Sequence, residues 1–472
     1  MITCQDSLSY LKELSDFDID MIYADPPYAL GSEVIIRKDG KVDYAKANDF
    51  MNKWTMPTGS YWEAWFIEAY RTLKHGGYLI MFGMDRQLLL FKYYACLAGF
   101  VEQQSLYWYF ISNFPKATDL SKMIEKNAGI EPIGSKPPSF GLANKEKGWN
   151  TVNQQLIMPE LQTDLAKKYE GYKYSISPLK QTNETIMVFQ KPCLTGSPLH
   201  DTLAYENGDK TITVSALNID GNRVGVSGGI THCDNRDENG KCLGHNNAGK
   251  TTSGETVHAD ESDGGRYPAQ TFIDSKVAEI LDRQSGVSKS QMTEISNVVS
   301  IVGNGIYGGS ENSDTRLGGY DDIGGCSKIL HKCDYTDEDY DLYNYEPKVS
   351  ASERSAGCDD REAINVNDGR NTPIDNPYQR GETLRVNTHP TLKPIALNEK
   401  ILKLFKTPND QKICYPFAGA GSEIIGGIKA GFDNWCGCEI SQEYVDIANA
   451  RIKYWKEEMT TQTSIFDFIG KD

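Results

Sequence analysis

Alternating strand and helix patterns at both ends of this chain constrain its fold more than any other feature. In the first 112 residues, apolar runs of strand length alternate with helical patterns. This order predicts a mostly parallel sheet with helices on both faces. The expected strands are 2–5, 19–24, 78–82 and 106–111, and the expected helices are 7–14, 61–73 and 86–98, the second of them stopped by the glycines at 76 and 77.

The same alternation returns near the C-terminus. Residues 386–460 predict helices at 395–405, 424–430 and 443–455, and strands at 412–415 and 435–438. Neither end alone supplies a full sheet, so we expect one Rossmann-like α/β core assembled from residues 1–112 and 386–460. Residues 461–472 are left as a tail.

The region between the two halves, residues 113–385, predicts a large insertion. Most of it is rich in Gly, Asn, Asp and Ser, which is typical of long loops. One apolar run near 184–190 predicts a strand that returns to the core sheet. The 472-residue chain therefore fits two or three structural units.

Charge is distributed unevenly along the chain. Residues 193–380 carry 17 basic and 31 acidic side chains and so hold most of the net charge of −16. Overall attraction therefore does not drive binding to nucleic acid. Residues 101–192, with 11 basic and 9 acidic side chains, are the best candidate for a local basic surface.

Other patterns point to a cytoplasmic protein. We find no apolar run of transmembrane length and no signal peptide at the N-terminus. The 11 cysteines are scattered and odd in number, which favours reduced thiols over a disulfide framework. Cys233, Cys242 and His245 have a spacing unlike that of a standard zinc knuckle, so no metal is expected.

Asp25-Pro26-Pro27-Tyr28 directly follows a strand that is apolar throughout. Ligands of open α/β sheets bind at the carboxyl ends of strands. The two prolines remove N–H donors and leave carbonyl acceptors beside a carboxylate and an aromatic ring. This set suits a planar group that bears an NH2: Asp25 and the Pro26 carbonyl accept its hydrogens, and Tyr28 stacks on its ring. A plain strand-ending turn is the alternative.

Pro416 to Gly421, with the sequence P-F-A-G-A-G, follows one strand and opens a helix. The glycines allow close backbone approach, and a helix N-terminus favours a negative group. Glu439 ends the next strand, twenty residues after Gly419, where nucleoside-binding βαβ units carry the acid that binds ribose hydroxyls. Together these features predict a nucleoside cofactor.

The two halves together resemble the amino-group DNA methyltransferases that use S-adenosylmethionine, in the motif order called beta. In that order the D-P-P-Y motif comes first, a target-recognition region follows, and the cofactor glycines lie near the C-terminus. His389 to Pro394, with the sequence H-P-T-L-K-P, resembles the family's H-P-T-x-K-P element. Further segments resemble bacterial and phage members: Asn113 to Lys116, Glu184 to Pro192, Arg266 to Ala269 and Ser352 to Arg354.

The resemblance implies a role for each matching position. Asp25, Pro26, Pro27 and Tyr28 would hold the target amine, and the sheet would have seven strands, one of them antiparallel. The implied cofactor residues are Phe417, Gly419 and Gly421 at the methionine end, Glu439 at the ribose, Asp6 near the adenine and Lys393 near the entrance.

The implied reaction is methyl transfer to the N6 amine of adenine in a specific sequence of double-stranded DNA, with the base flipped out of the helix. The implied setting is a bacterial or phage-infected cell, and both a homodimer and a cognate restriction enzyme are compatible with it. In the basic region we expect Lys116, Lys122, Lys167, Lys168 and Lys173 to contact phosphates.

One departure keeps alternatives open. The family usually has Asp before Pro-Phe, whereas this chain has Tyr415. Loss of that acid weakens cofactor binding unless another group replaces it. A catalytically weakened DNA-binding relative is therefore one alternative. Methylation of cytosine N4, or of an amine in RNA or protein, is another, because the tetrapeptide serves any of these amines.

Overall fold

The structure is a computed structural model in which strand, helix and loop placement is described for most of the two ends of the chain and for parts of the middle. The described residues are 2–28, 33–45, 57–110, 117–130, 161–175, 179–223, 268–273, 275–289, 293–295, 316–318, 323–324, 326–332, 349–366 and 383–469. The uncommon Cys and His spacing at 233–245, and the lysine at 116, lie outside them.

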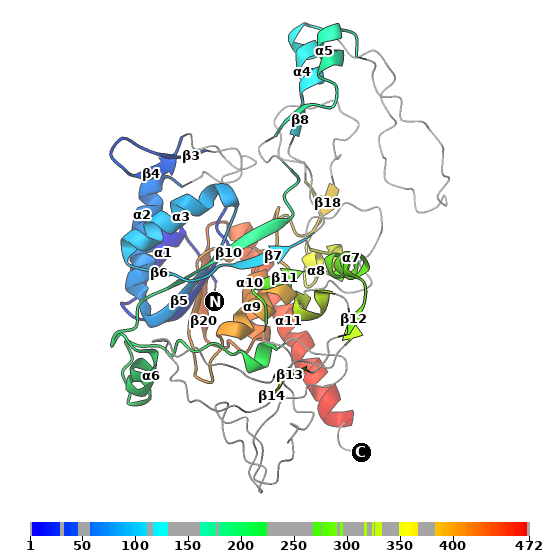
Figure 1. Ribbon diagram of the computed structural model, residues 1–472. Coiled ribbons are helices and arrows are strands. Elements are labelled where there is room, and N and C mark those ends of the chain that lie inside the picture. The colour runs from blue at the N-terminus through cyan, green and yellow to red at the C-terminus, as the bar shows by residue number, and fades with distance from the viewer. Residues whose placement is uncertain are drawn as a thin grey trace.

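A single large sheet forms the centre of the molecule (Figure 1). Its strands lie in the order β1-β20-β19-β2-β5-β10-β7-β11-β16, and β6 pairs with β10. The strands are β1 (Ile2–Cys4), β2 (Ile19–Ala24), β5 (Leu73–Gly83), β6 (Val101–Glu102), β7 (Leu106–Tyr109), β10 (Asn183–Gln190), β11 (Thr271–Ile273), β16 (His331–Lys332), β19 (Ile413–Tyr415) and β20 (Trp435–Glu439).

Strands from both chain ends alternate within this sheet. β19 and β20, from the C-terminal half, lie between β1 and β2 and are parallel to both. β10 lies between β5 and β7 and is antiparallel to both. The expected Rossmann-like α/β class is confirmed in this mostly parallel arrangement. Seven of the strands, β1, β20, β19, β2, β5, β10 and β7, match the expected sheet with one antiparallel strand. β6, β11 and β16 add three more and bring the sheet to ten strands.

Helices from the N-terminal half cover one face of the sheet. They are α1 (Ser7–Glu13), α2 (Gly59–Thr72) and α3 (Asp85–Ala98). Trp62, Trp65 and Phe66 of α2 are fully buried against alternate side chains of β5 and β10. Each such aromatic side chain stabilises the fold by roughly 1.5–3 kcal/mol through burial.

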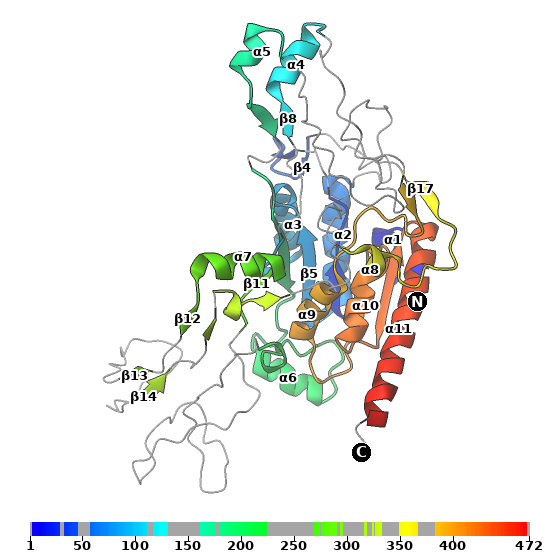
Figure 2. The same ribbon diagram turned by 90° about the vertical axis from the view of Figure 1, so that its right-hand side faces the viewer.

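Helices from the C-terminal half cover the other face (Figure 2). They are α9 (Ile395–Phe405), α10 (Ser422–Lys429) and α11 (Gln442–Ile469). α9 has the bounds that its apolar spacing predicts, whereas α11 runs beyond the expected end at 455 because no glycine or proline interrupts it. Because helices cover both faces of the sheet, side chains on both sides of these strands are buried, and nearly all of them are apolar.

The join between α2 and β5 differs from the sequence prediction. The glycines at 76 and 77 do not end the helix; α2 ends at Thr72 and β5 begins at the next residue. Lys191, buried after β10, makes this possible, since its Nζ donates to the carbonyls of Tyr70 and Leu73, both at 2.7 Å. These are C-terminal carbonyls that a helix leaves without intrahelical donors. Burial lowers the pKa of Lys191 to about 8.

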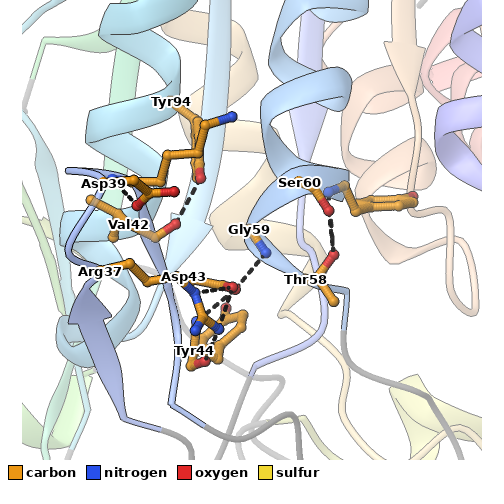
Figure 3. A network of polar contacts seen from close by, with 11 residues as sticks. Arg37, Asp39, Val42, Asp43, Tyr44, Thr58, Gly59, Ser60 and Tyr94 are labelled. Carbon is orange, nitrogen blue, oxygen red and sulfur yellow. Dashed lines mark hydrogen bonds and ion pairs between the residues drawn. The ribbon is translucent and has the colours of Figure 1, made fainter.

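A hairpin of β3 (Val34–Ile36) and β4 (Val42–Tyr44) packs on the start of α2 and on α3 (Figure 3). Asp43 accepts from the N–H of Gly59 at 2.7 Å and from Arg37 Nε at 2.8 Å. Burial alone would raise the pKa of Asp43, but these donors lower it overall. Tyr94 of α3 donates to the Val42 carbonyl at 2.7 Å. The hairpin is thereby fixed to both helices.

The insertion contributes a separate arm (Figures 1 and 2). It contains β8 (Ala117–Asp119), α4 (Leu120–Asn127), α5 (Asp164–Lys168) and β9 (Lys173–Ser175), with β8 and β9 antiparallel. The arm leaves after β7 and returns before β10, which run in opposite directions. It therefore stands at the carboxyl-end edge of the parallel strands.

The remaining described elements are short, belong to the insertion and are not part of the main sheet. The helices are α6 (Pro198–Glu206), α7 (Ser275–Ser285) and α8 (Ala351–Ser355), with 3-10 turns η1 (Asp220–Asn222) and η2 (Cys326–Ile329). The two-stranded pairs are β12 (Ser288–Lys289) with β15 (Ile323–Gly324), β13 (Thr293–Ile295) with β14 (Arg316–Gly318), and β17 (Ile364–Val366) with β18 (Thr383–Arg385). Among the described helices, none combines the length and apolar character needed to cross a bilayer.

The substitution Lys191→Met tests the α2–β5 join. It leaves two carbonyls without their donor, and we expect the free energy of unfolding to fall by about 1–3 kcal/mol. Urea denaturation at pH 7 measures the change. Lys38→Met, at an exposed lysine of the hairpin, is the control and should change stability by less than about 0.5 kcal/mol. Equal stability of Lys191→Met and the wild-type protein would contradict this account of the join.

Candidate active site

The sequence-predicted site residues meet at one edge of the sheet. Asp25 follows β2, Pro416 follows β19, Glu439 ends β20 and Asp6 lies just beyond β1. These four strands are neighbours and run parallel, so their carboxyl ends lie side by side. The two halves of the chain thus build one site at the edge where parallel sheets bind ligands.

A buried lysine joins the D-P-P-Y motif to the C-terminal half. Lys393 Nζ lies 2.6 Å from Asp25 Oδ2, 3.4 Å from Glu184 Oε2 and 3.2 Å from the Tyr28 hydroxyl. Tyr28 donates to Glu184 Oε2 at 3.2 Å. The Lys393 side chain is only 5% exposed and that of Glu184 only 3%, so this is a desolvated cluster of one cation and two carboxylates.

Asp25 keeps one acceptor atom available. Its Oδ1 is buried and has no hydrogen-bond partner in the described part of the chain. Burial, followed by the Asp25 charge, raises the pKa of Tyr28 well above its usual value, so this phenol stays protonated. The Pro27 carbonyl is contacted by Gln87 Nε2 at 3.4 Å, and the same amide donates to the Tyr44 hydroxyl at 3.0 Å. Gln87 therefore links the β3–β4 hairpin, through Tyr44, to the D-P-P-Y motif.

The glycine loop makes a tight turn between β19 and α10. Gly419 and Gly421 have φ values of +49° and +81°, a region that side chains disfavour. A Cβ on Gly419 would lie 3.0 Å from His389 Nε2, and one on Gly421 would lie 3.1 Å from the Cβ of Ala448. The loop is therefore closely surrounded on both sides, and only glycine fits.

Glu439 holds this loop in place. Its Oε2 accepts from the Gly419 N–H and its Oε1 from the Ser441 N–H, both at 3.0 Å. The residue is 8% exposed, and burial raises its pKa from the usual value. Each carboxylate oxygen has more than one lone pair, so an acceptor position remains beside the loop.

The H-P-T-L-K-P segment is supported by α8. Arg354 Nη1 donates to the His389 carbonyl at 2.6 Å, and Glu353 Oε1 accepts from the Ile395 N–H at 2.9 Å. Asn387 is fully buried and donates to the Arg354 carbonyl at 2.7 Å. Helix α8 thus fixes the H-P-T-L-K-P segment, which contains Lys393. The segment at 352–354, which resembles one in the family, lies in this helix; the resemblance gave it no role and predicted no helix there.

Asp6 and Phe417 flank the loop on the side of α2. Asp6 caps α1 by accepting from the Ser9 N–H at 3.0 Å, and it also accepts from the Tyr61 hydroxyl at 3.0 Å. The Phe417 ring stacks on Trp65 with centroids 5.8 Å apart. Both residues therefore have structural partners at the places where the resemblance expects a cofactor.

Tyr415 occupies the position at which the resemblance leads one to expect Asp. Its ring is 1% exposed and packs edge-on to Tyr23 at 6.2 Å. The hydroxyl is buried without a hydrogen-bond partner in the described part of the chain and lies close to Gly427 of α10. Burial raises the Tyr415 pKa well above its usual value. The residue acts as a core side chain, and no acid is present at this point of β19.

Four of the five lysines expected to contact DNA belong to the arm. Lys122 lies on α4, Lys167 and Lys168 on α5 and Lys173 on β9, and all four are exposed. Burial opposes ionisation of Asp119, but hydrogen bonds from Ser121 and the Lys122 N–H, followed by the charges of Lys122 and Lys173, lower its pKa overall. The fifth, Lys116, lies outside the described residues.

Sequence reasoning missed three groups at the site. It placed Lys393 at the cofactor entrance and did not expect its contact with Asp25. It gave Glu184 no role, although an acid that opens an apolar strand is a visible signal. It also did not predict the buried Arg451, whose Nη1 donates to the Ala420 carbonyl at 2.6 Å. Its spacing from Tyr444, Ile447 and Ala448 places it on the buried face of α11, and this was the signal that could have found it.

Comparisons with known proteins agree on one family. The family model described as DNA methylase matches residues 19–450. The type II methyltransferase M.HpaI of Haemophilus parainfluenzae is 29% identical over 121 residues, which span 25% of this chain and 35% of that enzyme. The chain therefore matches about a third of the length of this relative.

Two solved structures were also similar. The complex of M1.HpyAVI with SAM is 11% identical with a TM-score of 0.32, covering 96% of this chain and 98% of that one. The PvuII DNA methyltransferase, described as cytosine-N4-specific, is 10% identical with a TM-score of 0.35, covering 96% of this chain and 85% of that one. Scores this low do not by themselves establish a shared fold.

Lys393→Met tests the charged cluster. Two buried carboxylates then lose their cation, and we expect the free energy of unfolding at pH 7.5 to fall by about 3–5 kcal/mol.

Urea denaturation at pH 7.5 measures the change. Lys403→Met, at an exposed lysine near the end of α9, serves as the control and should be close to neutral. Equal stability of Lys393→Met and the wild-type protein would show that Lys393 does not compensate the charge of the two carboxylates.

Proposed function

Because this chain belongs to the DNA methylase family of N6 and N4 amino-methyltransferases, we propose that it transfers a methyl group from S-adenosylmethionine to the exocyclic N6 of adenine in DNA. Residues 1–112 and 386–460 would form the methyltransferase core. Residues 113–385, apart from the strand at 184–190, would form the target-recognition region. The N–H hydrogens of the target amine would go to Asp25 and to the Pro26 carbonyl.

The unoccupied acceptor of Asp25 carries this proposal. Its Oδ2 is held by Lys393, while its buried Oδ1 has no partner in the described chain. A buried carboxylate oxygen without a donor is costly unless a ligand supplies one. Accepting hydrogen bonds from both hydrogens of an aromatic amine draws the nitrogen toward sp3 geometry. That change frees its lone pair for attack on an electrophilic methyl group.

Lys393, Glu184 and Tyr28 position the acceptor. The ammonium fixes the Asp25 rotamer, and Glu184 fixes both the ammonium and the Tyr28 hydroxyl. Tyr28 is thereby held with its ring beside Asp25, where it can stack on the target base. A base inside a duplex cannot reach this cluster, so the proposed reaction requires base flipping.

The glycine loop fits the cofactor. Gly419 and Gly421 allow the tight turn that opens α10, and the N–H groups at the start of that helix would face the negative end of the cofactor. Glu439 retains an acceptor position for ribose hydroxyls, and Phe417, Asp6 and Lys393 complete the residues proposed to surround the loop. When bound, S-adenosylmethionine supplies a methyl group on a sulfonium centre, which needs no covalent enzyme intermediate.

The choice of adenine rests on Asp at the first position of the D-P-P-Y motif. By resemblance, members with Asp there are mostly adenine-specific and those with Ser mostly cytosine-specific. N4 of cytosine is the alternative, because both amines present the same two hydrogens to Asp25 and Pro26. A noncatalytic DNA-binding relative is the second alternative, suggested by Tyr415 in place of an acid.

Nucleoside analysis tests the reaction and its base. DNA incubated with the protein and S-adenosylmethionine should contain N6-methyladenine when digested and examined by mass spectrometry. Asp25→Ala should lower the rate by at least about 100-fold, since loss of one well-placed acceptor costs a few kcal/mol in the transition state. Asp433→Ala, at an exposed aspartate before β20, is the control.

N4-methylcytosine without N6-methyladenine would replace the adenine proposal by its alternative. No modified base with any DNA, together with measurable DNA binding, would support the noncatalytic relative. More than about a tenth of wild-type activity in Asp25→Ala would remove Asp25 from the chemistry.

The arm supports a role in DNA binding. It stands at the same sheet edge as the D-P-P-Y motif and carries Lys122, Lys167, Lys168 and Lys173 on its surface. Two tyrosines, Tyr172 and Tyr174, are 64% and 63% exposed beside Lys173. Basic side chains near exposed aromatic rings suit a nucleic acid backbone and its bases. We propose that the arm contacts the DNA next to the flipped base.

Replacing the four arm lysines by alanine should weaken DNA binding for all sequences alike. The slope of log affinity against log salt should become shallower by up to about 0.9 for each phosphate that the variant no longer neutralises. Fluorescence anisotropy with labelled duplex at several salt concentrations gives this slope. The control replaces four exposed lysines elsewhere: Lys12, Lys403, Lys453 and Lys456. An unchanged slope in the arm variant would exclude the arm as the DNA-binding surface.

A further inference from the structure

Glu423 is a buried acid that the mechanism above does not use. It lies in the first turn of α10, two residues after Gly421, and is 5% exposed. In the described part of the chain its carboxylate forms no ion pair and no hydrogen bond with another residue; its own N–H is its backbone donor. A carboxylate in this situation costs free energy unless a cation reaches it.

The groups around Glu423 place it between the glycine loop and the D-P-P-Y motif. The charges of Asp25, Lys393 and Arg451 all act on its carboxylate, and its own charge acts on Tyr28 and Tyr415. Burial, then the Asp25 charge, raises the pKa of Glu423 to about 8.

Both neighbouring cations are already engaged. Lys393 is shared by Asp25 and Glu184. Arg451 is fully buried and directs its Nη atoms to the Ala420 carbonyl, the Ser422 hydroxyl and the Glu353 carbonyl, at 2.6, 3.0 and 3.1 Å. Neither ion forms a hydrogen bond or ion pair with Glu423. Their charges lower its pKa, but burial and the Asp25 charge outweigh them, so a cationic ligand would stabilise the carboxylate further.

S-adenosylmethionine carries two positive charges, on the sulfonium and on the α-ammonium of its methionine end. The sulfonium charge disappears during transfer, so a carboxylate paired with it would stabilise the reactant more than the transition state and slow the reaction. The ammonium keeps its charge throughout. A carboxylate paired with the ammonium therefore contributes binding without opposing the chemistry.

We propose that Glu423 is a cofactor-binding residue whose carboxylate pairs with the α-ammonium of S-adenosylmethionine. The inference rests on the proposed function and identifies a residue for it that the motif comparison does not supply. Where Asp is expected on β19, this chain has the core residue Tyr415. Glu423 supplies an acid to the same region from the helix that follows.

Calorimetry with the full chain tests the pairing. Glu423→Gln should bind S-adenosylmethionine about 10- to 100-fold more weakly than the wild type, the usual range for a charge-assisted hydrogen bond. S-adenosylhomocysteine keeps the ammonium and lacks the sulfonium, and its affinity should fall by the same factor. Glu399→Gln, at a half-exposed acid of α9, is the matched control and should bind both ligands normally.

Each other result has a definite meaning. Loss of affinity for S-adenosylmethionine alone would assign Glu423 to the sulfonium and overturn the ammonium pairing. Unchanged affinity for both ligands in Glu423→Gln would overturn the proposal while leaving the proposed function intact. Failure of the wild type itself to bind either ligand would instead refute the proposed function.

Two further measurements separate binding from folding. Removal of a buried, unpaired carboxylate should leave the melting temperature of the ligand-free protein equal or higher at pH 8, so a lower one with weakened binding would overturn the proposal in favour of a structural role. Binding at pH 7 should also release protons from Glu423, as seen by calorimetry in buffers of different ionisation enthalpy. Proton release that persists in Glu423→Gln would contradict the assignment.

Discussion

The ion cluster centred on Lys393 is the interaction on which the site depends. It joins three parts of the chain that are far apart in sequence: Asp25 and Tyr28 from the first half, Glu184 from the strand β10 and Lys393 itself from the last quarter. Removing Lys393 would leave both carboxylates without their cation. The cluster therefore forms only when the three segments are correctly placed relative to one another. The acceptor at Asp25 is correctly oriented only when all three segments have reached their places in the sheet.

Much of the core could be predicted from the sequence because its signals are local. Strand β2 and helix α9 have the bounds that apolar runs and apolar spacing predict. The strand ends at Asp25 and Glu439 follow from short motifs that close those runs. The join at Thr72 could not be predicted, because Lys191, which satisfies the end of α2, comes from more than a hundred residues later. Strands β11 and β16 at the edge of the sheet could not be predicted either. Their apolar runs are short, and they form strands by pairing with β7 and with each other.

The site shows the same division between local and distant signals. Asp25, Gly419 and Glu439 stand at positions that chain order alone reveals. Glu423 acquires meaning only from its burial and from its neighbours in three dimensions, which no spacing rule reports. The acid that motif comparison expects at Tyr415 is absent from β19, while a buried acid is present on α10. A comparison of motifs detects the missing acid on β19, but it does not detect that Glu423 on α10 supplies a buried acid nearby.

The closing of β7 against β10 gives the arm an unusual independence. Tyr109 and Asn183 are register partners, and the Phe110 N–H donates to the Thr182 carbonyl at 2.9 Å. The chain thus leaves the sheet at Phe110 and re-enters it at Thr182, two residues joined by one backbone hydrogen bond. The entropy of closing such a loop changes only slowly with its length. The arm can lengthen, shorten or be exchanged for another without shifting one pair of the sheet, so its sequence is free to diverge faster than that of the strands that carry the D-P-P-Y motif and the glycine loop.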